Sequence, residues 1–129
     1  MKTIYIDSQN LAFWQTKSIP NVMALGFFDG IHLGHKKVIE TARTIAQEKN
    51  ITLTVMTFFP HPKTVLTKNV ETFDYLMPLS KKLSILQSLG VDTCYIVEFD
   101  KKFCSLSPKQ FVSNYLIDMN VLHAVAGFD

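Results

Sequence analysis

The chain has 129 residues, of which 47% are hydrophobic, 12% aromatic and 19% charged. That length allows one domain, and the apolar content is typical of a packed core rather than of a disordered chain. Thirteen basic residues against eleven acidic ones give a formal net charge of +2. A protein that binds nucleic acid through its phosphates usually carries a stronger basic field, so we expect no nucleic-acid partner.

Cysteine usage and the N-terminal residues indicate the compartment. Cys94 and Cys104 do not form a CxxC pair, and two cysteines are few for a disulfide-stabilised secreted domain. Asp7 arrives before an apolar signal core could form, and no apolar run approaches the roughly 20 residues that span a bilayer. We therefore expect free thiols, a cytoplasmic location and no membrane partner.

Apolar runs and amphipathic stretches alternate along the chain, which predicts strands and helices in alternation. Ser107, Pro108 and Gln110 form a capping-box pattern that marks a helix start. In chain order we expect an edge strand at 3–7, a buried strand at 22–27, a helix at 34–50, a strand at 51–59, a loop at 60–78, a helix at 80–89, a strand at 93–99, a helix from 107, and a fourth buried strand at 122–128.

This order of elements predicts an α/β fold, a parallel sheet with helices on both faces. In such sheets, ligands bind outside the carboxyl ends of the strands. The sequence stops at Asp129, directly after a predicted strand. We therefore expect a domain that is incomplete at its C-terminus and whose exposed apolar sheet surface favours self-association.

The stretch with the clearest chemistry is residues 26–35, which read GFFDGIHLGH. It joins the predicted strand at 22–27 to the following helix, so backbone N–H groups and the positive end of the helix dipole face the crevice. Gly26 and Gly34 permit close approach of a ligand to the backbone. His32 and His35 can converge on one anion, and either can carry a positive charge. The pattern favours a phosphate site.

Two other interpretations of this stretch stay open. The glycines can form a tight turn with no ligand, and no Gly-Lys-Ser/Thr sequence is present to indicate a Walker loop. The histidine pair can also be half of a metal site, but His61 and His123 are the other histidines, and no Cys or carboxylate has matching spacing. We therefore predict no protein metal site.

The stretch resembles the signature of the HxGH nucleotidyltransferases. Together with residues 56–62, which read MTFFPHP, it is similar to the bacterial FAD synthetases. The resemblance continues through residues 89–92, 99–100, 106–112 and 126–129 in the expected order. It implies a Rossmann-like fold and the N-terminal part of an FMN adenylyltransferase domain, without the riboflavin kinase domain that usually follows.

The family pattern also implies roles for individual residues. It implies that His32 and His35 are catalytic and steady negative charge on the triphosphate. The implied ATP-binding residues are Gly26, Phe27, Asp29, His32, Gly34 and His35. The implied flavin-binding residues are Phe59, Pro60, His61, Pro62 and Asp129.

The implied reaction is attack of an FMN phosphate oxygen on the α-phosphorus of ATP, with Mg²⁺ accompanying ATP and pyrophosphate leaving. Such a step depends mainly on positioning and charge stabilisation. Two alternatives remain at this point. One is another HxGH adenylyl- or cytidylyltransferase, and the other is a truncated or degenerate module that binds nucleotide or flavin without catalysis.

Overall fold

A computed structural model describes residues 1–29, 33–59 and 78–127. Within them lies one parallel five-stranded sheet with the strand order β1-β4-β3-β2-β5. Because every strand runs the same way, the carboxyl ends of all five meet at one edge of the sheet. The predicted parallel α/β fold is therefore confirmed. The strands are β1 (Lys2–Ile6), β2 (Asn21–Leu25), β3 (Thr52–Phe59), β4 (Thr93–Glu98) and β5 (Val121–Ala126).

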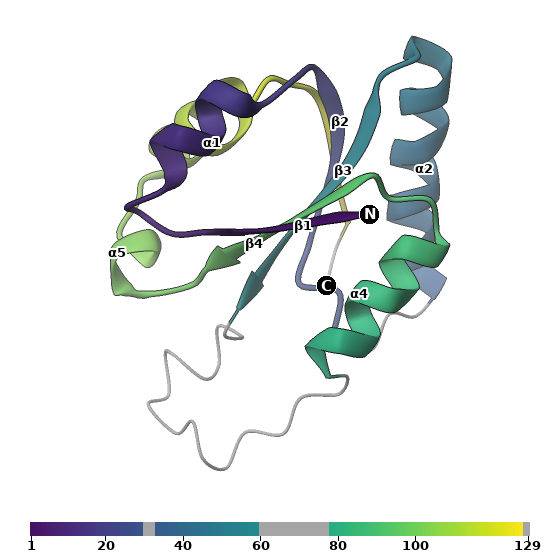
Figure 1. The fold of residues 1–129 in the computed structure, drawn as a ribbon, viewed down its shortest axis with the longest axis horizontal. Helices are drawn as coiled ribbons and strands as arrows, with labels where there is room; N and C mark the ends of the chain where they lie inside the picture. Colours follow the sequence, from purple (N-terminus) through teal and green to yellow (C-terminus); the bar gives the residue numbers. More distant parts are fainter. Residues whose placement is uncertain (30–32, 60–77, 128–129) are drawn as a thin grey trace.

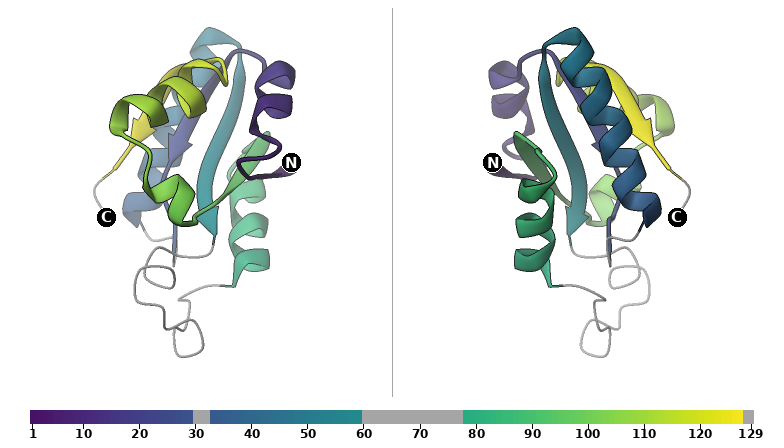
Figure 2. Two further views of the ribbon diagram at one scale, coloured as in Figure 1. Left: turned by 90° about the vertical axis from the view of Figure 1, so that its left-hand side faces the viewer. Right: turned by 90° about the vertical axis from the view of Figure 1, so that its right-hand side faces the viewer.

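Helices cover both faces of the sheet (Figures 1 and 2). Helices α2 (Leu33–Lys49) and α4 (Leu79–Ser88) lie on one face. The other face carries four shorter elements: α1 (Leu11–Lys17), α5 (Lys101–Cys104), α6 (Pro108–Phe111) and the π-helix η2 (Val112–Ile117).

Alternating side chains of the central strands form the two halves of the core. Val22 and Ala24 of β2 pack with the α2 and α4 face, whereas Met23 between them packs with the opposite face. Cys94 and Tyr95 of β4 divide in the same way. This period of two places every second residue on the same side of the sheet, so the central strands are packed on both faces.

Three parts of the structure differ from the sequence-based expectation. The short helices α1 and α5 were not predicted. The helix that starts at Pro108 changes to π-helical geometry at Val112. The prediction that the last strand is buried is wrong: β5 is an edge strand, and Leu122 is 63% exposed.

Among residues 1–29, 33–59 and 78–127, no helix is long and apolar enough to cross a membrane. The same residues contain no group of three or more His, Cys, Asp or Glu side chains that could hold a metal ion.

Candidate functional site

The Gly-Phe-Phe-Asp segment, residues 26–29, follows β2 at the carboxyl edge of the sheet. Its position is fixed by the neighbouring strand: the N–H of Gly26 donates to Met56 O at 3.2 Å, and Thr57 Oγ1 donates to Phe27 O at 3.0 Å. Both acceptor and donor lie on β3, next to β2 in the sheet. The segment therefore leaves the centre of the sheet along one defined path, toward the start of α2.

The backbone of Phe28 changes the direction of the segment, and its side chain packs against the first turn of α2. Its backbone has φ +54°, a left-handed conformation that a bulky residue rarely adopts. Its ring is 1% exposed and meets the ring of His35 edge-on, with centroids 5.5 Å apart. His35, in the first turn of α2, is itself 6% exposed. Packing of these two rings connects the segment to the N-terminal turn of α2.

Gly26 is required by this packing. A Cβ atom at position 26 would lie 2.9 Å from Cζ of Phe28. The sequence indicated that Gly26 leaves room for a ligand, and the structure gives a second reason, which is room for the ring of Phe28. Gly34 lies exposed in the first turn of α2.

Lys82 of α4 is a site residue that the sequence analysis did not select. Its side chain is buried, yet its ammonium donates to Phe27 O at 2.8 Å and lies 3.5 Å from Asp29 Oδ1. Burial lowers the pKa of Lys82, and the nearby carboxylate of Asp29 opposes that lowering. A sequence signal existed, because Lys82 occupies the apolar stripe of its helix, four residues before the buried Leu86.

A cavity of about 560 Å³ adjoins the Gly-Phe-Phe-Asp segment on the face opposite α4. We call it the Phe27 cavity. The ring of Phe27 lies 5.1 Å from that of Phe58 and 6.1 Å from that of Phe99, measured between centroids. The volume and the apolar lining of this cavity are typical of small-molecule sites. The lining residues are Phe27, Phe58, Phe99, Phe103, Cys104, Leu106, Ser107, Pro108 and Phe111.

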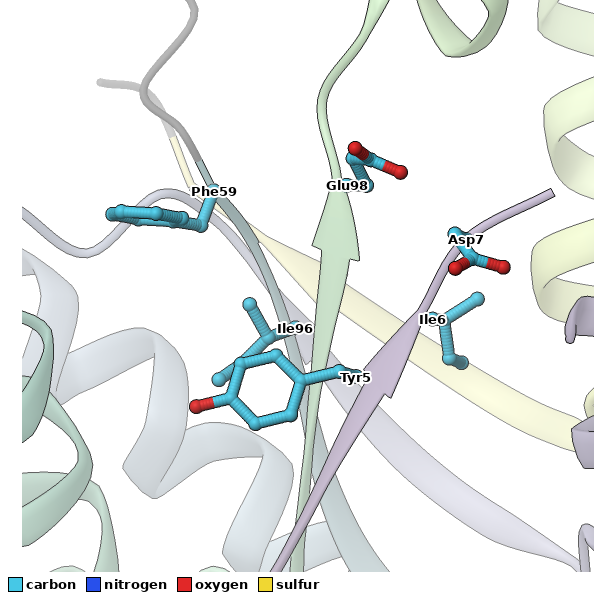
Figure 3. A pocket seen from close by; sticks show the side chains of 6 residues that line it. All are labelled: Tyr5, Ile6, Asp7, Phe59, Ile96 and Glu98. Atoms are coloured by element: carbon cyan, nitrogen blue, oxygen red, sulfur yellow. The ribbon is translucent and has the colours of Figure 1, made fainter. Parts of the chain in front are cut away.

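Phe59 lines a different cavity, of about 370 Å³, at the ends of β1, β3 and β4. Figure 3 shows Phe59 and Tyr5 on the two sides of Ile96, with the carboxylates of Asp7 and Glu98 near the strand ends. Phe58 and Phe59 are consecutive in β3, so their side chains point to opposite faces of the sheet. The predicted flavin residue Phe59 therefore does not line the Phe27 cavity.

The remaining predicted site residues lie outside the described part of the chain. These are His32 of the predicted ATP site and the predicted flavin residues Pro60, His61, Pro62 and Asp129. Of the predicted ATP-binding residues, the structure brings together Gly26, Phe27, Asp29, Gly34 and His35 around the end of β2 and the start of α2.

Comparison with known proteins identifies the family. Residues 15–129 match the family described as FAD synthetase. The chain belongs to the FAD synthetase family. It is 51% identical over 129 residues to the bifunctional riboflavin kinase/FMN adenylyltransferase of Bacillus subtilis (strain 168), covering 100% of this chain and 40% of that protein. The protein of the same description from Listeria monocytogenes is 47% identical, with 100% and 41% covered. The chain thus spans about two fifths of the length of these relatives.

Solved structures share the fold of this chain. A crystal structure described as a macrolide-efflux protein from Streptococcus pneumoniae has a TM-score of 0.81 and 30% identity, covering 100% of this chain and 43% of that one. Pantoate-beta-alanine ligase from Francisella tularensis has a TM-score of 0.52 and 20% identity, covering 90% and 45%. At that identity the second likeness concerns the fold alone.

Proposed function

We propose that the chain transfers AMP from ATP to FMN, releasing pyrophosphate and forming FAD. The observation that carries the proposal is the position of Phe27. Its backbone belongs to the segment that leads into α2, where a triphosphate would lie, and its ring lines the apolar Phe27 cavity. A nucleotide and a flavin bound at these two places would meet at one residue, as a transfer between them requires.

The nucleotide would lie over the Gly-Phe-Phe-Asp segment and the first turn of α2. Backbone N–H groups at a helix N-terminus are suited to phosphate oxygens, and the exposed Gly34 leaves the backbone accessible there. His32 and His35 would stabilise the charge that develops on the triphosphate. In this proposal Mg²⁺ enters with ATP as part of the substrate.

The flavin ring would enter the Phe27 cavity, whose phenylalanine rings provide an apolar wall for a planar heterocycle. An oxygen of the FMN phosphate then attacks the α-phosphorus. The new P–O bond forms as the bond from the α-phosphorus to the bridging oxygen breaks, and pyrophosphate departs. The protein supplies orientation and charge stabilisation, with no covalent intermediate. A cytoplasmic location and the roles of Pro60, His61, Pro62 and Asp129 belong to the same proposal.

Incubation of the chain with ATP, Mg²⁺ and FMN, with FAD followed by chromatography, tests the activity. We expect FAD from the wild type and a rate at least ~10²-fold lower from His35→Ala, the scale for loss of one transition-state donor. Because His35 is buried against Phe28, circular dichroism must show that the variant is folded. Saturable binding of both substrates without product would contradict catalysis by this chain and favour a binding module.

The location of the flavin is tested by a matched pair of variants. Phe99 lines the Phe27 cavity and Phe59 lines the cavity of Figure 3. We expect Phe99→Ala to weaken FMN binding about tenfold, or about 1.4 kcal/mol, and Phe59→Ala to change it less than twofold, measured by quenching of flavin fluorescence. The reverse order would place the flavin on the Phe59 side, and no FMN binding by the wild type would remove the flavin assignment.

A further inference from the structure

Lys82 carries the clearest unexplained charge in the described part of the molecule. Of the Lys, Arg, Asp and Glu side chains at 1–29, 33–59 and 78–127, Lys82 alone is buried, with 4% exposed. Removing an ammonium from water is costly unless the group is paired and hydrogen-bonded. Lys82 meets that requirement through residues 27 and 29. It thus lies against the segment proposed to hold the nucleotide.

Hydrogen bonds from β3 and α4 help to set the shape of residues 26–29. Gly26 and the carbonyl of Phe27 are bonded to β3, and Lys82 adds a second donor to the same carbonyl from α4. The left-handed backbone of Phe28 follows directly, a conformation that persists where surrounding contacts hold it. Of the residues that donate these hydrogen bonds, Lys82 also contacts Asp29, which follows the left-handed Phe28.

The charge of Asp29 gives Lys82 a second effect. The Asp29 side chain is 15% exposed and lies three residues after Gly26. A carboxylate there would repel the phosphates of a nucleotide bound at the start of α2. The ammonium 3.5 Å away offsets that charge. Lys82 therefore affects both the geometry of residues 26–29 and the electrostatic potential beside the bound phosphates.

We propose that Lys82 is a positioning residue for the nucleotide: it holds the carbonyl of Phe27 and the carboxylate of Asp29, and offsets the charge of Asp29 beside the triphosphate. This inference rests on the proposed function. Thr57 still holds the Phe27 carbonyl when Lys82 is absent. Loss of Lys82 thus affects the nucleotide more than the flavin in the Phe27 cavity.

The test compares Lys82→Met with Lys81→Met, a change at the adjacent exposed lysine of the same helix. Calorimetric titration with Mg²⁺–ATP is expected to show about tenfold weaker binding for Lys82→Met and a change below twofold for Lys81→Met. FMN affinity, measured by fluorescence, should change less than twofold in both. Unchanged ATP affinity in a folded Lys82→Met protein would overturn the proposal.

A double-mutant comparison separates positioning through Asp29 from a general loss of stability. In an Asp29→Asn background, Lys82→Met should weaken ATP binding by about threefold rather than tenfold, because the charge that Lys82 offsets is gone and only the donor to Phe27 O is lost. A tenfold loss in both backgrounds would contradict the proposal. If Lys82→Met does not fold, the test uses Lys82→Gln, because the glutamine amide can still donate to Phe27 O but carries no charge. We expect about threefold weaker ATP binding, and wild-type affinity would overturn the role of the charge.

Hydrogen exchange measured without any ligand distinguishes failure of the proposed function from failure of the inference about Lys82. If the wild-type chain binds no ATP, the nucleotide assignment fails by itself. Positioning is then read from the backbone amides of residues 26–29. Faster exchange there in Lys82→Met but not in Lys81→Met would support a clamp on the segment, whereas equal exchange in both variants would overturn it.

Discussion

At the scale of single residues, the site depends on consecutive side chains that point in different directions. Phe27 directs its ring into the Phe27 cavity, and Phe28 directs its ring under α2 toward His35. This divergence needs the left-handed backbone at Phe28 and the absence of a side chain at Gly26. The motif is therefore as much a packing arrangement as a ligand cradle.

Gly26→Ala is expected to destabilise the fold by about 1–3 kcal/mol, the usual cost of forcing an extra group into a packed site. The reason is the 2.9 Å approach of the new Cβ to Phe28 Cζ, which must displace a buried ring. Urea unfolding followed by circular dichroism measures the change. The double variant Gly26→Ala/Phe28→Leu removes the ring atom concerned and should lose less stability than the two single changes added together. Strict additivity would show that the contact is not the cause.

Cys94 makes the fold sensitive to alkali. Burial raises the pKa of its thiol from 9.0 to about 12. Between these values the folded chain keeps a proton that the unfolded chain releases, so stability falls as pH rises, by up to about 1.4 kcal/mol per pH unit. Burial also raises the pKa of Tyr95 and Tyr115, which acts in the same direction, whereas the lowered pKa of Lys82 acts in the opposite one.

Urea unfolding from pH 8 to 10.5 should therefore show a steeper loss of stability in the wild type than in Cys94→Ala. The matched control is Cys104→Ala, because that thiol is exposed, and its slope should equal that of the wild type. Equal slopes in wild type and Cys94→Ala would contradict a raised pKa at Cys94.

At the scale of elements, local signals predicted the parts of the fold that depend on local chemistry. The capping box at Ser107 and Gln110 is present with both reciprocal hydrogen bonds. The central strands and α2 also lie within a few residues of their predicted bounds. The prediction that β5 is buried was wrong, because an apolar run does not reveal whether its strand has neighbours on both sides. Lys82 was missed because its partners lie 55 and 53 positions earlier in the chain.

Ser107→Ala tests how the wall of the Phe27 cavity is held. Ser107 Oγ accepts from the N–H of Gln110 at 3.1 Å and begins the helix that carries Phe111. Loss of such a cap costs about 1 kcal/mol, so we expect that decrease in the free energy of unfolding. Ser113→Ala, at an exposed position of η2, should change stability by less than half as much. Equal effects would show that the cap is not responsible.

At the scale of the whole molecule, the two edges of the sheet differ. On one side β1 begins with the charged Lys2, a residue type that discourages pairing with another chain. On the other side β5 contains no Lys, Arg, Asp or Glu, and within the described residues it pairs with β2 alone. The apolar Leu122 is 63% exposed on it, and Ile117 of η2 is 64% exposed. β5 has no Lys, Arg, Asp or Glu side chain to repel a second copy of itself, so we expect two chains to meet at the β5 edge.

Sedimentation velocity over a range of concentrations should therefore show self-association of the chain, with Leu122→Lys shifting the distribution toward the monomer. The added ammonium would have to be buried, or placed beside its own copy, when two β5 edges pair, and both are unfavourable. Phe13→Lys is the matched control, because Phe13 is 53% exposed and belongs to α1 rather than to β5, and its association should equal that of the wild type. A monomeric wild type, or equal association in Leu122→Lys, would show that the β5 edge does not pair with a second copy.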